Sequence, residues 1–195
     1  MKVATEQFMH FGIRAITMDD IARLSGVSKK TIYQEFGDKN QLVYACFEQE
    51  LQEDACLMEE GLEKPDFDVL HTLVGQTQHI RKRFSTFNPL VLHELQRYFP
   101  SCWELFENFK REVILKHIKF LLEKGKEQGY FRAEIDTRIL AHMRLEQTMD
   151  TFDPLKFPPT QFDQVTLQLE IFDHFIHGIL SDKGREAYLS LKQTN

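Results

Sequence analysis

The residues with the clearest chemical potential lie in the stretch GVSKKTIYQEF, from Gly26 to Phe36. Its ammonium, hydroxyl and amide groups can bond to phosphate oxygens and to the edges of bases. These groups belong to Lys29, Lys30, Thr31, Tyr33 and Gln34. A helix that begins here adds unpaired backbone N–H groups and a partial positive charge, and both favour phosphate. The stretch therefore predicts contact with a polyanion rather than catalysis.

Two short helices joined by a tight turn would position these side chains. Thr17 is predicted to cap the first helix, MDDIARLS, with Asp20 in the capping-box position three residues later. Gly26 suits the turn, because glycine adopts positive φ without strain. Ser28 is predicted to cap the second helix. This pattern predicts a helix-turn-helix, in which the second helix enters the major groove of DNA.

The second of these helices has an apolar side and a polar side. Ile32 and Phe36 are four residues apart and share one face, while Ala22 of the first helix is small enough for close approach. The basic and hydroxyl residues remain on the open face. The plain alternative is a solvated face on a small helical bundle. The alternative function is a helical protein-interaction module without sequence-specific DNA binding.

The rest of the chain is also predicted to be helical, because apolar residues recur at spacings of three and four. A first helix is expected over Lys2–His10, and Asp38 is expected to cap a long fourth helix that breaks at Lys64-Pro65. The later helices are expected from Asp66 or Asp68 to about Phe84, between Pro89 and Pro100, from Ser101 to Gly125 or Gly129, over 135–149 and over 162–180, with a proline-rich loop at 153–160 and a short C-terminal piece.

Composition and charge restrict the class of protein. Hydrophobic residues at 42% and charged residues at 28% are ordinary for a globular chain of 195 residues. Cys46, Cys56 and Cys102 are interpreted as reduced thiols, and no signal core or membrane-spanning run is present, so we expect a cytoplasmic protein. The net charge of -6 argues against coating nucleic acid, but residues 1–44 carry six basic and five acidic residues. Contact with a polyanion is therefore expected from the first segment.

The run from Phe8 to Leu42 resembles the N-terminal DNA-binding domain of TetR-family transcriptional regulators. The shared features are FxxFG, TMDDIA, GVSKKTIY and FGDK ahead of the next helix. The resemblance implies an all-α protein with a helix-turn-helix three-helix bundle at 1–44 and a larger helical effector-binding and dimerisation domain at 45–195. It implies phosphate contacts from Thr17, Tyr33 and Lys39. The predicted DNA-binding set is Thr17, Ser28, Lys29, Lys30, Thr31, Tyr33, Gln34 and Lys39.

Two features depart from the family pattern. Family members usually carry several more residues, often basic, ahead of the first helix, where this chain has Met1 and Lys2. Glu35 stands where the family commonly has an aromatic residue or histidine. A carboxylate near phosphates is repulsive unless it points away or pairs with Lys39 or Arg23.

The resemblance also implies how such a protein would act. We expect a repressor that is released from a palindromic operator in double-stranded DNA by a small-molecule effector of unknown identity. A homodimer is expected through the last two long helices, and two recognition helices related by a dyad suit a palindrome. The effector pocket is expected among Phe84, His93, Phe99, Trp103, Phe106 and Phe120, whose simpler role is in the core.

No enzymatic motif is present in the sequence. There is no GxSxG, no glycine-rich phosphate loop, and LHELQ lacks the second histidine of HExxH. His174 and His177 have helical spacing for two metal ligands, but no cysteine or carboxylate set completes them, so core or interface roles are favoured. We therefore expect no enzyme, no cofactor and no metal.

Overall fold

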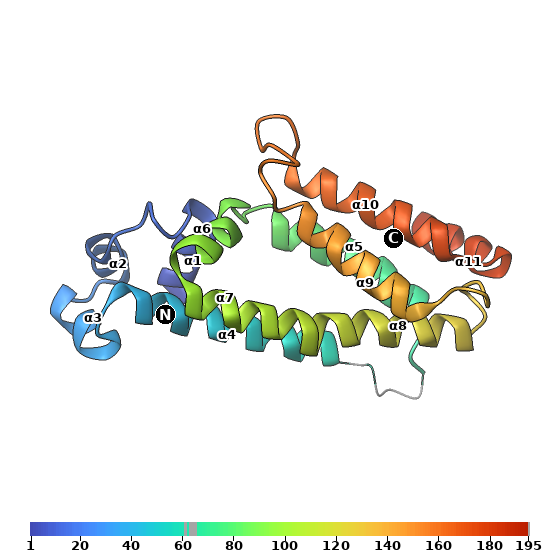
Figure 1. Cartoon of the computed structure of the whole chain (residues 1–195), viewed down its shortest axis with the longest axis horizontal. Helices are drawn as coiled ribbons and strands as arrows, with labels where there is room; N and C mark the ends of the chain where they lie inside the picture. Colours follow the sequence, from blue (N-terminus) through green and yellow to red (C-terminus); the bar gives the residue numbers. More distant parts are fainter. Residues whose placement is uncertain (61, 63–65, 195) are drawn as a thin grey trace. The chain divides into compact units, whose positions relative to one another are not determined.

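The structure, a computed structural model, is all-α, as the periodicity predicts (Figure 1). It describes residues 1–60, 62 and 66–194. Within these residues, β pairing is confined to an isolated antiparallel bridge between Phe131 and Leu180. Over the same residues, no helix combines the length and the apolar character needed to cross a membrane.

The chain divides into two compact units, each made from two segments. Unit 1 consists of Met1–Leu57 and Thr86–Phe109, and unit 2 of Met58–Ser85 and Lys110–Asn195. Unit 1 holds α1 (Lys2–Phe11), α2 (Met18–Ser25), α3 (Lys29–Phe36), nearly all of α4 (Lys39–Glu59), α6 (Leu90–Tyr98) and α7 (Pro100–Phe109). Unit 2 holds α5 (Val69–Phe84), a π-helical turn η1 (Lys110–Ile114), α8 (Leu115–Glu127), α9 (Thr137–Asp150), α10 (Gln164–Ile179) and α11 (Asp182–Thr194). The functional division at residue 44 stays a prediction.

Side chains at the helix starts explain where several helices begin. Asp38 Oδ1 accepts a hydrogen bond from the Gln41 backbone N–H at 2.9 Å, which satisfies a free donor in the first turn of α4. Asp68 does the same for α5 through the His71 N–H at 2.9 Å, so Asp68 rather than Asp66 is the cap. Asp136 and Asp163 cap α9 and α10.

The core of unit 1 joins the N-terminal helices to α6 and α7. The rings of Phe47 and Phe106 lie 6.0 Å apart, and the Asn88 N–H donates to the Met9 carbonyl at 2.8 Å. Burying a side chain of this size stabilises the fold by roughly 1.5–3 kcal/mol. The buried apolar residues are Ala4, Phe8, Ile13, Met18, Ile21, Ala22, Ile32, Leu42, Val43, Cys46, Phe47, Leu51, Val91, Leu95, Phe99, Cys102, Phe106 and Phe109.

The core of unit 2 is formed by α5, α8, α9, α10 and α11. Tyr188 of α11 is fully buried in it, and α11 packs against α5. Gly184 lets the start of α11 approach the backbone of Tyr130, because a Cβ there would lie 2.0 Å from the Tyr130 carbonyl oxygen. The C-terminal helix is therefore an integral part of this core.

The structure differs from the expected elements at three places. Ser101 is no cap, because α7 begins at Pro100, and proline is favoured at a first helical position. The expected long helix after Ser101 contains a π-helical turn, while its end at Glu127 lies between the two expected glycines. The short C-terminal piece is a helix of 13 residues. The expected break at Lys64-Pro65 lies outside the described residues, and α4 ends at Glu59.

Candidate nucleic-acid interface

The turn between α2 and α3 has the geometry that the sequence predicts. Thr17 accepts a hydrogen bond from the Asp20 N–H at 3.1 Å, and Asp20 accepts one from the Thr17 N–H at 3.1 Å, which completes the capping box. Gly26 is left-handed, with φ 66° and ψ 24°. The Ser28 hydroxyl accepts from the Thr31 N–H at 3.0 Å and caps α3. The two helices therefore form a helix-turn-helix (Figure 1).

α3 presents most of its surface to solvent. Ile32 is 5% exposed and is the buried residue of this helix, while Phe36 is half-buried. The predicted groove-facing residues are all exposed: Ser28, Lys29, Lys30, Thr31, Tyr33 and Gln34. An open helix of this kind, anchored by one isoleucine and capped at its N-terminus, can place amine, hydroxyl and amide groups against phosphates and base edges.

Lys29 is held by an acidic residue of the preceding helix. Its Nζ lies 2.8 Å and 3.0 Å from the two carboxylate oxygens of Asp19. The hydrogen bond to Asp19 raises the pKa of Lys29, so the amine stays charged. Lys30 has no ion-pair partner among the described residues. The two adjacent lysines thus differ: Lys29 is paired with Asp19, and Lys30 is not paired with any described residue.

Thr17, a predicted phosphate contact, is part of a small network. Its hydroxyl donates to Asp20 Oδ2 at 2.6 Å, and Arg23 Nη2 donates to Asp20 Oδ1 at 3.1 Å. These bonds, led by the one from Thr17, lower the pKa of Asp20 to about 2. The network keeps the start of α2 ordered.

Lys39, the other predicted phosphate contact outside α3, has an intramolecular role. Its Nζ donates to the backbone carbonyls of Ile13, at 2.7 Å, and Ile16. Partial burial lowers the pKa of this amine, and the nearby Glu94 carboxylate opposes the shift. These two bonds hold the loop between α1 and α2. They use two of the three N–H donors of Lys39, so one donor remains for another acceptor.

Glu35, the residue that departs from the family pattern, is exposed on α3. The two cations considered as its partners are engaged elsewhere, Arg23 with Asp20 and Lys39 with backbone carbonyls. Glu35 has no ion pair in the part of the chain that the structure describes. Its carboxylate remains a source of repulsion toward any phosphate that comes close.

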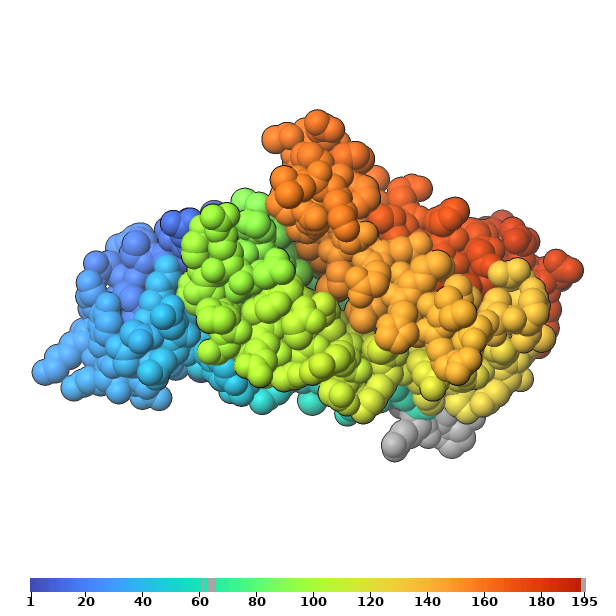
Figure 2. Space-filling view, in the orientation of Figure 1, coloured from blue at the N-terminus to red at the C-terminus, as the bar shows by residue number. Residues whose placement is uncertain are grey.

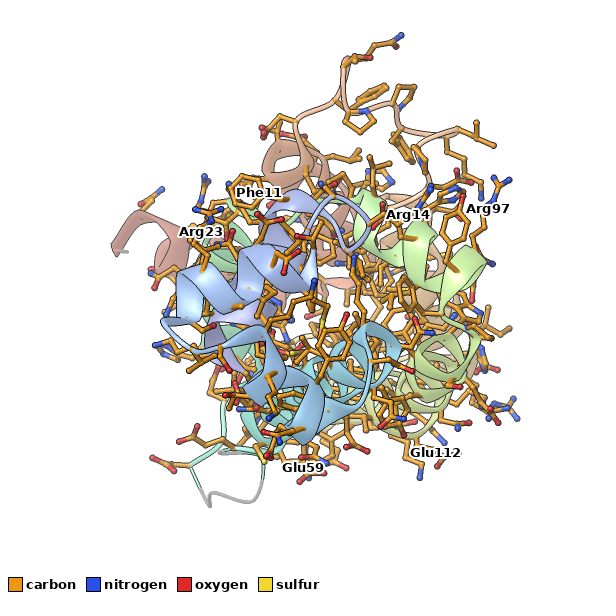
Figure 3. All side chains as sticks on the ribbon, turned by 90° about the vertical axis from the view of Figure 1, so that its left-hand side faces the viewer. Phe11, Arg14, Arg23, Glu59, Arg97 and Glu112 are labelled. Atoms are coloured by element: carbon orange, nitrogen blue, oxygen red, sulfur yellow. The ribbon has the colours of Figure 1, made fainter. Side chains whose placement is uncertain are left out.

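Sequence reasoning missed the contacts that α6 makes with the α1–α2 loop. Glu94 Oε2 accepts hydrogen bonds from the Ile13 N–H at 2.6 Å and the Arg14 N–H at 3.1 Å. The Arg14 guanidinium lies 4.5 Å from the centre of the Tyr98 ring and donates to its hydroxyl at 3.2 Å. Arg97 also lies over this ring at 5.6 Å, so two arginines meet at the exposed edge of unit 1 (Figure 3). No local motif predicts contacts between residues that are 80 to 84 positions apart.

The six residues of the predicted effector pocket fall into separate contacts. Trp103 and Phe106 lie 5.6 Å apart in unit 1, where Phe99 is also buried. In unit 2, Phe84 contacts Phe152, and Phe120 contacts Phe67. His93 is exposed on α6. The pocket stays a prediction.

The last long helices carry both core and exposed apolar residues. Phe172, Phe175, Ile176 and Ile179 of α10 belong to the core of unit 2. On α9, Ile139 is 66% and Met143 42% exposed, one helical turn apart. His177 of α10 lies 3.5 Å from Asp173, and His174 is exposed. No group of three metal-binding side chains is found over the described ranges.

The N-terminal segment matches a known protein family. Residues 1–46 match the family described as bacterial regulatory proteins, tetR family. The chain is 27% identical over 176 residues to YvaF, an uncharacterized HTH-type transcriptional regulator of Bacillus subtilis (strain 168), over 89% of this chain and 90% of the relative.

Solved structures share the fold over nearly the whole chain. A putative transcriptional regulator from Saccharomonospora viridis, in complex with choline, superposes with a TM-score of 0.72 at 17% identity, covering 92% of this chain and 95% of the other. The transcriptional regulator FadR from Bacillus subtilis, in complex with stearoyl-CoA, gives a TM-score of 0.58 at 20% identity, covering 91% and 96%. At these identities, the likeness concerns the fold.

Proposed function

The chain belongs to the TetR family of helix-turn-helix transcriptional regulators, which bind DNA and are not enzymes, and we propose that it is a repressor released from a palindromic operator by a small-molecule effector. The observation that carries the proposal is the exposure of α3. This helix buries Ile32 and offers Lys29, Lys30, Thr31, Tyr33 and Gln34 to solvent behind a capped N-terminus. In our proposal, α3 lies in the major groove, where its lysines meet base edges and the flanking phosphates, and Thr17, Tyr33 and Lys39 add phosphate contacts.

The proposed operator is palindromic because the proposed active form is a homodimer. Ile139 and Met143 form an exposed apolar strip on α9, and an interface between copies of α9 and α10 would cover it. A dyad between two recognition helices suits half-sites about one turn of DNA apart.

The proposed release mechanism is a shift between two conformations. The effector binds the larger domain more tightly in the DNA-incompetent conformation than in the DNA-binding one. The difference between these two binding free energies is the most by which the effector can weaken operator binding. In this mechanism, α4 and α6 transmit the shift, since Lys39 of α4 and Glu94 of α6 both bind the α1–α2 loop. The choline and stearoyl-CoA complexes of similarly folded regulators support a small-molecule effector and leave its identity open.

The test is the salt dependence of binding to palindromic duplexes. Operator candidates are selected from a random duplex library, and their Kd is measured by fluorescence anisotropy between 50 and 200 mM salt. For a protein that makes six phosphate contacts, this increase in salt weakens binding by about 10³-fold. Replacing Lys29 and Lys30 together by alanine should weaken binding and reduce the salt slope by roughly two. Lys82→Ala with Lys119→Ala, two exposed lysines of unit 2, is the matched control.

Two results would contradict the proposal. If no duplex were enriched and binding showed no salt slope, the protein-interaction alternative would be favoured. If the Lys29 and Lys30 variant bound the selected duplex like the control variant, α3 would not be the recognition helix.

A further inference from the structure

A buried arginine stands in the middle of α9 in unit 2. Arg144 is 8% exposed, and its Nη1 is inaccessible to solvent. The guanidinium has no hydrogen bond and no ion pair with the residues that the structure describes. Arginine stays charged in proteins, so this position holds a positive charge inside the protein.

The surroundings of Arg144 are aromatic and aliphatic. Its Cζ lies 5.2 Å from the centre of the Phe172 ring and 5.7 Å from that of Phe175, both on α10. Ala141 and Leu145 of α9 are buried close by in sequence. Burial lowers the pKa of Arg144 to about 10, and no acidic group is close enough to oppose that shift.

Three further buried polar atoms of unit 2 have no hydrogen bond among the described residues: Gln147 Oε1, His117 Nδ1 and Tyr188 Oη. Gln147 follows Arg144 by one turn on α9, and its Oε1 is buried without a hydrogen bond among the described residues. His117 lies on α8, the helix that packs against α9, and its ring bonds to the Met58 backbone but leaves Nδ1 buried without a partner. Buried polar groups are almost always hydrogen-bonded, so this unit contains polar capacity that the chain itself does not use.

A negatively charged partner would stabilise the buried charge of Arg144. An isolated buried charge is strongly unfavourable, and a cation–π contact offsets only part of this cost. An oxyanion bound to the guanidinium would form charge-assisted hydrogen bonds in a medium where they are strong. Phe172 and Phe175 would lie against the apolar part of the same ligand.

We propose that Arg144 binds the oxyanion group, a carboxylate or a phosphate, of an effector whose remaining body is apolar. This inference rests on the proposed function, because it gives the charge and polarity of the effector assumed there. Under this proposal, the effector group that meets Arg144 is neither cationic nor neutral.

The test uses four probes with the same eight-carbon chain: octanoate, octyl phosphate, octanamide and octylamine. Their Kd for the full-length protein is measured by isothermal titration calorimetry, together with the shift in Tm. We expect one or both anions to bind and to raise Tm, and the relative affinity of octanoate and octyl phosphate identifies the oxyanion. Octanamide should bind at least about 30-fold more weakly than the better anion, because it cannot form the charge pair.

Variants at Arg144 separate a binding role from a structural one. Arg144→Met should fold with unchanged or higher Tm, since an apolar side chain of similar length relieves the buried charge, and it should lose at least about 30-fold in anion affinity. Arg144→Lys keeps the charge and should bind the anion with intermediate affinity. Arg185→Met, an exposed arginine of α11, is the control and should bind like the unmodified protein.

The inference would be overturned if neither anion bound, if octanamide or octylamine bound as tightly as the anions, or if Arg144→Met retained the anion affinity. Should Arg144→Met fail to fold, the affinities of the four probes for the unmodified protein decide whether the site binds an anion.

Operator release is measured separately with the same probes. Anion binding without release would support the site at Arg144 and contradict the proposed release mechanism. Release by octanamide alone would support that mechanism and overturn the assignment of Arg144.

Discussion

Lys39 and Glu94 bind the same backbone segment between α1 and α2, one through its carbonyls and the other through its N–H groups. Lys39 Nζ donates to the Ile13 carbonyl at 2.7 Å, and the Ile13 N–H donates to Glu94 Oε2 at 2.6 Å. The two charged side chains come from α4 and α6. Together they hold the loop that leads into the capping box at Thr17.

Removing Glu94 should loosen this loop. Glu94→Ala leaves the Ile13 and Arg14 N–H groups without their acceptor, and we expect a loss of about 1–3 kcal/mol in the free energy of unfolding. Urea denaturation measures it. Glu6→Ala, an exposed glutamate of α1, is the control and should change stability by less than about 0.5 kcal/mol. Equal stability of the two variants would show that Glu94 does not hold the loop.

Asp19 should restrain Lys29 in the free protein. Asp19→Asn removes the ion pair at 2.8 Å and one negative charge beside α3, so we expect operator affinity to increase by about 2- to 5-fold at low salt. Anisotropy titrations measure this change, with Asp182→Asn on α11 as the control for net charge. A decrease in affinity would mean that the pair instead orients Lys29 for binding.

The capping box of α2 should titrate in acid. The pKa of the Asp20 carboxyl is lowered from its ordinary value to about 2, mainly by the Thr17 hydrogen bonds. A lowered pKa means that the carboxylate stabilises the folded state above pH 4 and that this contribution is lost as the pH falls through about 2. Carbon-detected NMR titration of the Asp20 carboxyl checks the value.

Thr17→Val is the variant for this titration. It removes the hydroxyl but keeps the backbone N–H, so the pKa of Asp20 should rise part of the way toward its ordinary value. An unchanged pKa in this variant would show that the threonine hydroxyl is not the main cause of the shift.

The exposed strip on α9 should form the dimer interface. Ile139→Asp with Met143→Asp places two carboxylates on the strip, and we expect a monomer by light scattering with operator affinity reduced at least 10-fold. Leu155→Asp, in the protruding loop between α9 and α10 where Leu155 is 90% exposed, is the control and should remain dimeric (Figure 2). A dimer that survives the α9 substitutions would place the interface elsewhere.

Local chemistry made the helix-turn-helix predictable from the sequence. The helix caps and the left-handed turn involve residues only a few positions apart, namely Thr17, Asp20, Gly26 and Ser28 with their neighbours. Such bonds depend on residue type and spacing, so the sequence determined the bounds of α2 and α3 and the exposed set on α3. The periodicity of apolar residues likewise determined that the chain is all-α.

Tertiary structure decided the features that depend on residues distant in sequence. The pairing of Glu94 with Ile13 spans 81 residues, and the amine of Lys39 turns to carbonyls 23 and 26 residues away. The burial of Arg144 against Phe172 and Phe175 depends on how α9 packs against α10. A helical pattern shows which side of one helix is apolar, but the partner of a long polar side chain is selected only when several helices come together, because its hydrogen bonds and desolvation depend on all of them.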